Sequence, residues 1–228
     1  MAGPYRRCAM LRATAITHRF GAATVLDSVD FDLDSGELIG ICGASGTGKS
    51  TLGRILAGHL RPNAGRVTLD GVPVAPLPGA ACPVQYAPQM SELSLDPRWR
   101  VERILRNGGD PDPMALRLLG VDPAWAGRFP AELSGGELAR VSLARLVLPS
   151  TRCLICDEIT APLDALAAEV IMTALVSLAR QGLGIVLIGH DTRLLDRYTQ
   201  RLLLLSGGRL APPDSGRAGG GTCPVSTS

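Results

Sequence analysis

Short apolar runs alternate with helical patterns along this chain, and that alternation predicts an α/β fold. The run from Leu38 to Cys42 has the length of a buried parallel strand. Further runs of this kind lie at 154–158, 184–189 and 202–205. Leu52, Ile55 and Leu56 repeat at i, i+3 and i+4, which is typical of one face of a helix. A second helix is predicted over 164–181, closed by Gly182.

Two regions depart from this alternation. Near the start, residues 11–20 and 25–33 predict antiparallel strands, and residues 67–69 and 72–74, joined by an Asp-Gly turn, predict a hairpin. From about 90 to 143, short helical patches separated by Gly-Asp-Pro and Val-Asp-Pro breaks predict an inserted helical subdomain. We expect one domain over 11–210, a flexible start over 1–10 and a disordered tail over 211–228, which is rich in Gly, Pro, Ser and Thr.

Composition and charge limit the function classes. Apolar residues make up 46% of the 228 residues, yet no run approaches the roughly 18 residues needed to cross a bilayer. The net charge of +2 does not indicate nucleic-acid binding. Arg6 and Arg7 are reminiscent of a twin-arginine export signal, but no hydrophobic stretch follows them. We therefore expect the protein to remain in the cytoplasm.

The cysteines do not predict a metal site. Cys153 and Cys156 have C-x-x-C spacing within an apolar run, and an offset of three on a strand places two side chains on opposite faces. We expect both to be core residues that neither pair nor share a metal. The remaining cysteines, Cys8, Cys42, Cys82 and Cys223, show no metal-ligand spacing.

A glycine-rich loop lies between the first buried strand and the first helix. Its residues are Gly43, Ala44, Ser45, Gly46, Thr47, Gly48, Lys49, Ser50 and Thr51. Glycines let successive backbone amides point inward around phosphate oxygens, and the helix N-terminus adds positive charge. Lys49 can then reach the β- and γ-phosphates, and the Ser50 hydroxyl can ligate Mg²⁺. An ordinary glycine turn is the alternative, but the flanking strand and helix patterns favour a nucleoside triphosphate site.

Two acids end the apolar run at 153–156. Because open α/β sheets place their sites at the carboxyl ends of strands, Asp157 suits the Mg²⁺ shell. Glu158 should point to the other side of the strand, where it can polarise an attacking water. A solvated strand end is the alternative interpretation of this pair.

The segment Leu133-Ser134-Gly135-Gly136-Glu137, called here the LSGGE segment, opens a helix predicted to reach about Leu148. Its S-x-x-E spacing is that of a capping box. A cap does not require two consecutive glycines, which do permit close approach of a phosphate. If this helix start and the glycine-rich loop bind one nucleotide across a two-fold axis, the protein works as a dimer with two sandwiched nucleotides.

The order of these motifs, followed by Leu163-Asp164 and His190, is similar to that of the ATP-binding cassette (ABC) ATPases and covers about residues 11–210. The resemblance implies a P-loop NTPase (RecA-like) core with an antiparallel β subdomain and an inserted α-helical subdomain. It implies ATP and Mg²⁺ as ligands and Glu158 as general base. Phe20 matches the aromatic residue that stacks on adenine, with core packing as its alternative role.

The resemblance also implies roles for residues that contact the γ-phosphate or the partners. Gln89 matches the glutamine that touches Mg²⁺ and senses the membrane partner, with Gln85 as competitor. Ser134, Gly135 and Gly136 would contact the nucleotide held by the opposite subunit, Asp164 the dimer partner, and His190 the γ-phosphate and the attacking water. Two positions depart from the family pattern: Glu137 stands where glutamine is commoner, and Pro162 where a small residue is usual.

The function implied is that of an ATP-hydrolysing motor subunit of an ABC transporter, on the inner face of the cell membrane. Residues 94–105 and 156–160 look like the branch that imports oligopeptides, dipeptides and nickel, so the cargo would be peptides, nickel or metal chelates. The partners would be a second cassette, identical or paralogous, transmembrane permease subunits and, indirectly, a substrate-binding protein. A soluble ABC ATPase of DNA repair, chromosome organisation or translation is the alternative, and a small-molecule kinase a third class.

Overall fold

The main sheet of the protein has six strands and forms the centre of the molecule. The computed structural model describes residues 11–75, 81–89 and 95–213. In spatial order the strands are β10 (Arg209–Ala211), β9 (Arg201–Ser206), β3 (Leu38–Cys42), β8 (Gly184–Ile188), β7 (Cys153–Asp157) and β6 (Val84–Ala87). All neighbours pair in parallel except β10, which runs antiparallel to β9. The carboxyl ends of the parallel strands therefore meet at one edge.

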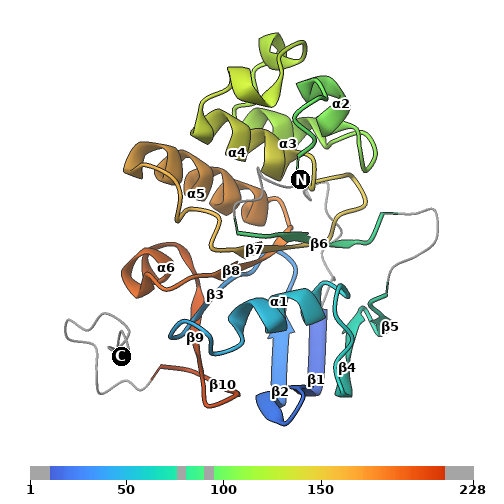
Figure 1. Ribbon diagram of the computed structural model, residues 1–228, viewed down its shortest axis with the longest axis vertical. Coiled ribbons are helices and arrows are strands. Elements are labelled where there is room, and N and C mark those ends of the chain that lie inside the picture. Colours follow the sequence, from blue (N-terminus) through green and yellow to red (C-terminus); the bar gives the residue numbers. More distant parts are fainter. Residues whose placement is uncertain (1–10, 76–80, 90–94, 214–228) are drawn as a thin grey trace.

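A second sheet, of four antiparallel strands, lies below the main one (Figure 1). Its order is β2 (Ala23–Leu33), β1 (Leu11–Phe20), β4 (Ala64–Leu69) and β5 (Val72–Pro73). Helix α1 (Lys49–Leu56) lies between the two sheets and buries Leu52, Ile55 and Leu56 in a core that both sheets share. The predicted antiparallel strands and the hairpin are confirmed.

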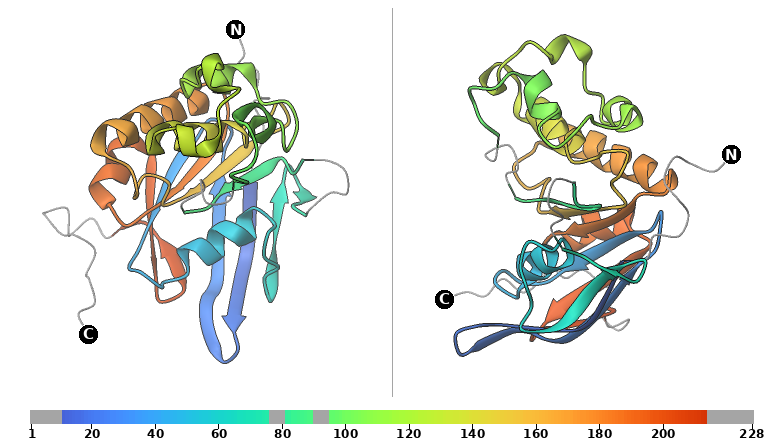
Figure 2. Two further views of the ribbon diagram at one scale, coloured as in Figure 1. Left: turned by 45° about the horizontal axis from the view of Figure 1, so that its top comes forward. Right: turned by 90° about the vertical axis from the view of Figure 1, so that its right-hand side faces the viewer.

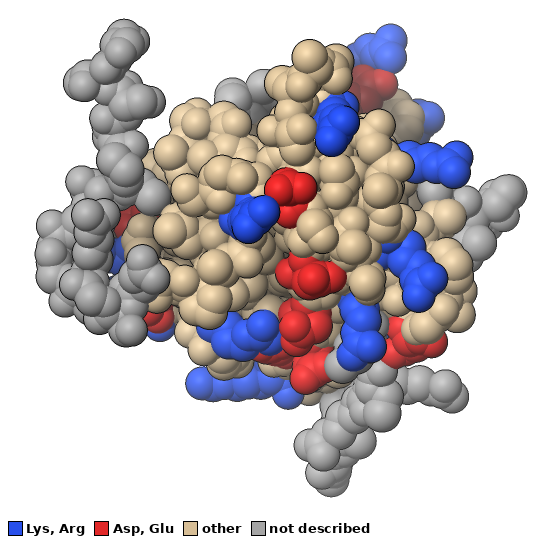
Figure 3. Space-filling model, turned by 90° about the horizontal axis from the view of Figure 1, so that it is seen from below, with Lys and Arg blue, Asp and Glu red and all other residues tan. Residues whose placement is uncertain are grey.

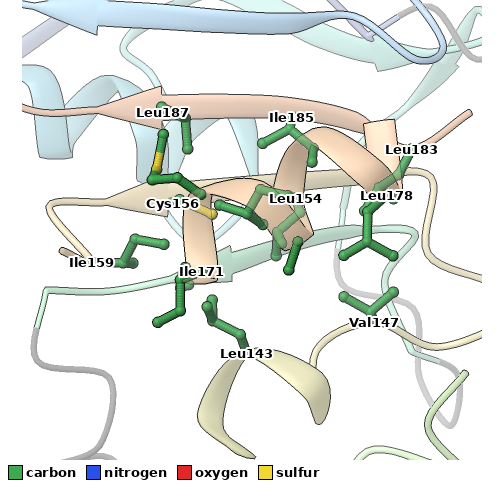
Figure 4. Close-up of a cluster of buried hydrophobic side chains, with 14 of the residues drawn as sticks. Leu143, Val147, Leu154, Cys156, Ile159, Ile171, Leu178, Leu183, Ile185 and Leu187 are labelled. Carbon is green, nitrogen blue, oxygen red and sulfur yellow. The ribbon is translucent and has the colours of Figure 1, made fainter. Parts of the chain in front are cut away.

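The opposite face of the main sheet is covered by α5 (Ala165–Arg180), and α4 (Gly135–Ala144) lies beyond it (Figure 1). Figure 4 shows Leu154 and Cys156 of β7 pointing into this core, toward Ile171 and Leu178 of α5. Cys153 belongs to the core on the other face. The two cysteines are 1% and 0% exposed and lie on opposite faces, as the strand spacing predicted.

A small helical region lies at the end of the molecule far from the antiparallel sheet (Figures 1 and 2). It comprises α2 (Val101–Leu105), α3 (Pro113–Leu118), the short 3₁₀ turns η2 (Pro123–Trp125) and η3 (Pro130–Glu132), and α4. Trp125 and Val101 are buried in its own apolar cluster. A helical insertion between β6 and β7 was predicted, and its short helices match the predicted breaks.

The ends of two predicted elements were wrong, and one strand was not predicted. Helix α4 ends at Ala144 rather than near Leu148, because Thr151 Oγ1 accepts from the Leu148 amide and donates to the Leu146 carbonyl, which draws the chain out of the helix. Strand β7 ends at Asp157 rather than at Glu158. The short strand β10 was not predicted; it completes a hairpin with β9 and ends at Ala211.

The surface carries charges of both signs. On the face shown in Figure 3, acidic and basic side chains lie close together. On the described surface, Arg209 and Asp27 form an ion pair at 3.3 Å. Helix α6 (Thr192–Tyr198) completes the fold beside β9.

In the described part of the chain, no helix combines the length and apolar character that a membrane span requires. The predicted flexible start and most of the predicted disordered tail lie outside the described residues.

Candidate functional site

The glycine-rich loop connects β3 to α1 at the carboxyl edge of the main sheet, as predicted. Gly48 caps α1 with φ 101°, a conformation that L side chains rarely adopt. A Cβ at Gly48 would lie 2.5 Å from Val25 Cγ1, and one at Gly43 would lie 2.5 Å from the Leu205 carbonyl oxygen. Both positions therefore require glycine, because the neighbouring strands approach the loop closely.

The Lys49 ammonium lies inside the curve of this loop. The residue is 6% exposed, and Nζ donates to the carbonyl oxygens of Gly43 and Ala44, each at 2.8 Å. A buried charge is costly unless it is hydrogen-bonded, so these carbonyls hold the cation in place. Lys49 is the only lysine in the sequence. A cation held beside a cradle of backbone amides is suited to bind the oxygens of a polyphosphate.

Asp157 ends β7 and has a buried carboxylate, of which one oxygen accepts a hydrogen bond and the other has no partner among the described residues. It is 3% exposed, and Tyr86 Oη donates to Asp157 Oδ2 at 2.5 Å. Asp157 Oδ1 is buried and has no hydrogen-bond partner among the described residues. Burial, the bond to Asp157 and the nearby negative charge raise the pKa of Tyr86 well above its ordinary value, so this phenol is a donor.

This unpartnered oxygen fits a divalent cation. Mg²⁺ is usually bound through one or two carboxylates together with substrate phosphates and water. In the described part of the chain, no three His, Cys, Asp or Glu side chains cluster as an all-protein metal site. Asp157, together with the exposed Ser50 at the start of α1, is therefore suited to a cation that arrives with a phosphate ligand.

Glu158 brings together two other predicted residues. Gln89 Nε2 donates to Glu158 Oε2 at 3.0 Å, and His190 Nδ1 lies 3.6 Å from Glu158 Oε1. Glu158 has φ 50°, and its amide donates to the Ile188 carbonyl oxygen at 2.9 Å. The expected strand alternation does not apply here, because the chain leaves β7 before Glu158. The residue nevertheless points away from the core, with its side chain 21% exposed.

Gln85, the competitor of Gln89, is directed elsewhere. Gln85 Nε2 donates to the Cys82 carbonyl oxygen at 2.7 Å. It lies within β6, whereas Gln89 lies just beyond the end of that strand. Of these two glutamines, Gln89 is the one that contacts an acid at this edge, Glu158.

The LSGGE segment forms the N-terminus of α4 as the predicted capping box. The Ser134 amide donates to Glu137 Oε2 at 2.7 Å, and the Glu137 amide donates to Ser134 Oγ at 3.3 Å. A Cβ at Gly136 would lie 2.9 Å from Ala167 Cβ on α5, whereas one at Gly135 would meet nothing within 4 Å. Gly136 thus permits close packing of α4 on α5, and Gly135 leaves the helix start open.

A groove of about 340 Å³ lies between the starts of α4 and α5. Its lining includes Ser134, Gly135, Gly136, Pro162, Asp164 and Leu166. Asp164 caps α5, since its Oδ1 accepts from the Ala167 amide at 2.8 Å. None of the lining residues belongs to the glycine-rich loop or to the Asp157–Glu158 pair. A single chain therefore does not join the LSGGE segment to the phosphate-binding loop.

Phe20 lies at the end of β1 and is 56% exposed, so the alternative of core packing is wrong. The His18 ring meets it edge-on with ring centroids 4.7 Å apart. The exposed face of Phe20 is free to stack on a planar group. Tyr86 was not predicted as a site residue, although its place on a strand that precedes the acid-bearing run could have indicated a contact with Asp157.

Comparisons with known proteins identify the family of this chain. A family model described as "ABC transporter" matches residues 26–161. The nickel import ATP-binding protein NikE of Pseudomonas putida is 35% identical over 217 residues, which cover 87% of this chain and 80% of the relative. The hemin import ATP-binding protein HmuV of Rhodopseudomonas palustris is also 35% identical over 217 residues, covering 88% of this chain and 81% of the relative.

Solved structures support the fold. The dimeric structure of a bacterial ABC transporter cassette has a TM-score of 0.74 at 24% identity, covering 88% of this chain and 96% of that one. The predicted fold, an α/β cassette with an antiparallel β part and a helical insertion, is confirmed.

Proposed function

This chain belongs to the ABC transporter family as its ATP-hydrolysing subunit, and from that premise we propose that it powers an importer of nickel, metal chelates or peptides. The observation that carries the site assignment is the position of Glu158. Glu158 follows the buried Asp157 in the sequence, and its carboxylate contacts both Gln89 and His190. The proposed cargo class is supported by the likeness to nickel and hemin import proteins.

The proposed reaction is in-line attack of water on the γ-phosphorus of ATP. A bond forms between the water oxygen and phosphorus, the bond to the ADP oxygen breaks, and Glu158 accepts the proton of the water. The loop amides and Lys49 bind the phosphate oxygens and stabilise the charge that develops on them. Gln89 and His190 hold the Glu158 carboxylate toward the water, and His190 also faces the γ-phosphate.

Mg²⁺ bound with ATP would neutralise part of the phosphate charge. The groups of this chain that fit it are the Ser50 hydroxyl, Asp157 Oδ1 and the side-chain oxygen of Gln89. Phe20 supplies a ring on which adenine stacks. Gly43, Ser45, Gly46, Thr47, Gly48 and Thr51 complete the triphosphate cradle.

The second half of each site comes from another subunit. Ser134, Gly135 and Gly136 contact the γ-phosphate held by the neighbour, and Asp164 contacts the neighbour itself. This arrangement is supported by the open Gly135 and by the separation of the LSGGE groove from the glycine-rich loop. The partner is an identical chain or a paralogue, and both cassettes lie against permease subunits on the cytoplasmic face of the membrane.

ATP hydrolysis by the purified chain, with and without possible partners, tests this proposal. We expect the rate to rise more than linearly with protein concentration and to increase further with permease subunits in liposomes. A rate increased by DNA or ribosomes instead would favour the soluble alternative. Transfer of phosphate to an acceptor other than water would support a kinase.

A further inference from the structure

Tyr86 on β6 and Gln89 just beyond this strand contact the two acids at the end of β7, although neither contact follows from the motifs. The two strands run in parallel with Tyr86 opposite Ile155. From this position the Tyr86 hydroxyl donates to Asp157 Oδ2, while Gln89, beyond the strand end, donates to Glu158. Strand β6 and Gln89 just beyond it therefore orient two consecutive carboxylates that have different roles.

The bond from Tyr86 determines how Asp157 presents its oxygens. Oδ2 is occupied by the phenol at 2.5 Å, and Oδ1 is buried without a partner among the described residues. A carboxylate held through one oxygen cannot rotate freely to bind a cation through both. Outer hydrogen bonds of this kind orient metal ligands and raise metal affinity.

Tyr86 is itself held firmly. The residue is 7% exposed, and a Cβ at Gly53 of α1 would lie 3.1 Å from Tyr86 Cε2, so the helix backbone passes close to the ring. The His59 ring meets the phenol edge-on, with ring centroids 5.6 Å apart. Packing on two sides leaves the hydroxyl little room to move away from Asp157.

We propose that Tyr86 is a positioning residue that directs Asp157 Oδ1 alone toward the Mg²⁺ of bound Mg-ATP. The inference rests on the proposed function, since it needs Asp157 to be the metal ligand. Loss of the Tyr86 hydroxyl should therefore weaken the part of nucleotide affinity that depends on Mg²⁺. The contacts between the glycine-rich loop and the triphosphate should remain unchanged.

Tyr86→Phe tests the inference because it removes the hydroxyl and keeps the ring. The affinity for a fluorescent ATP analogue is measured in Mg²⁺ and in EDTA. The ratio of the affinity in Mg²⁺ to the affinity in EDTA measures how much Mg²⁺ contributes to nucleotide binding. We expect the ratio to fall about tenfold, the low end of the effect of losing an outer-shell partner, while affinity in EDTA stays within about twofold of wild type. Tyr198→Phe, on the distant helix α6, is the matched control and should change neither value.

A double-mutant cycle with Asp157→Asn separates positioning from general destabilisation. If Tyr86 acts through Asp157, adding Tyr86→Phe to Asp157→Asn should lower the ratio little further. The Tyr86→Phe protein is expected to melt at a lower temperature, because Asp157 Oδ2 loses its donor, so titrations are run well below that temperature.

The outcomes are distinct. An unchanged ratio in Tyr86→Phe, or an equal fall in the wild-type and Asp157→Asn backgrounds, would overturn the role of Tyr86 and leave the proposed function intact. A wild-type protein whose ATP affinity does not depend on Mg²⁺, or an Asp157→Asn protein with the wild-type ratio, would overturn the metal assignment and this inference with it.

Discussion

The side-chain amide of Gln89 lies 3.0 Å from Glu158 Oε2, which joins a residue just beyond β6 to the acid just beyond β7. The other oxygen of this carboxylate, Glu158 Oε1, lies 3.6 Å from His190 Nδ1. Glu158 is thus contacted by residues that follow β6 and β8, the two strands that flank β7. A movement of Gln89 would change the orientation of Glu158, and under the proposed function this is a physical route by which a membrane partner would control hydrolysis.

Glu158→Gln should bind ATP normally and hydrolyse it at least about a hundredfold more slowly, the low end of the contribution of a general base. The amide retains the size of the side chain but cannot accept a proton. We also expect ATP to trap this variant as a closed dimer. Single-turnover hydrolysis and size-exclusion chromatography with ATP measure the two effects, and near-normal turnover would refute the role of Glu158.

Comparing Glu158→Gly with Glu158→Ala should reveal backbone strain at this position. Both variants lose the carboxylate, but only glycine relieves the cost of φ 50°. Because the left-handed conformation costs an L-residue roughly 1–2 kcal/mol, we expect the glycine variant to be more stable than the alanine variant by about 1 kcal/mol. Urea unfolding measures the difference, and equal stabilities would show that the conformation is not strained.

Lys49→Ala should lose nucleotide binding, because the substitution removes the cation that the loop places over the phosphates. Since Lys49 is the only lysine in the sequence, an amine-reactive reagent can modify a single side chain. We expect ATP to protect Lys49 from this reagent, as measured by peptide mass spectrometry. Equal modification with and without ATP would contradict the assignment.

Gly135→Ala and Gly136→Ala should differ in stability but not in their effect on hydrolysis. The Gly136 methyl would lie 2.9 Å from Ala167 Cβ, an overpacking that typically costs about 1–3 kcal/mol. The Gly135 methyl meets nothing within 4 Å, so we expect no loss of stability. Both should slow hydrolysis, because both crowd the neighbour's γ-phosphate. Full activity of Gly135→Ala would argue against this contact.

Cys153 and Cys156 should resist alkylation in the folded protein. Burial raises the pKa of Cys153 to about 12 and that of Cys156 further still, so both remain protonated thiols at pH 8, where an ordinary cysteine partly ionises. Cys82, which is only half-buried, should react before them. Mass spectrometry after iodoacetamide treatment with and without urea measures this, and rapid native labelling of Cys156 would contradict the buried position of β7.

Helix and strand positions followed from the sequence wherever local patterns and burial agree. The run at 38–42 is apolar because β3 is buried on both faces, and the spacing of Leu52, Ile55 and Leu56 matches the face of α1 that packs into the core. The end of α4 did not follow, because apolar residues at 146–148 remain buried after the helix stops. Apolar spacing reports burial, and burial continues where hydrogen bonds to Thr151 have already ended the helix.

The sequence by itself determined which residues could bind a triphosphate, since glycines, a lysine and two acids at these spacings have few other uses. Only the tertiary structure decided their neighbours: Tyr86 beside Asp157, Gln89 rather than Gln85 beside Glu158, and Phe20 at the surface. The reason is that these contacts depend on strand order. Residues 69 and 71 positions apart meet because β6 pairs with β7, and no local pattern encodes that pairing.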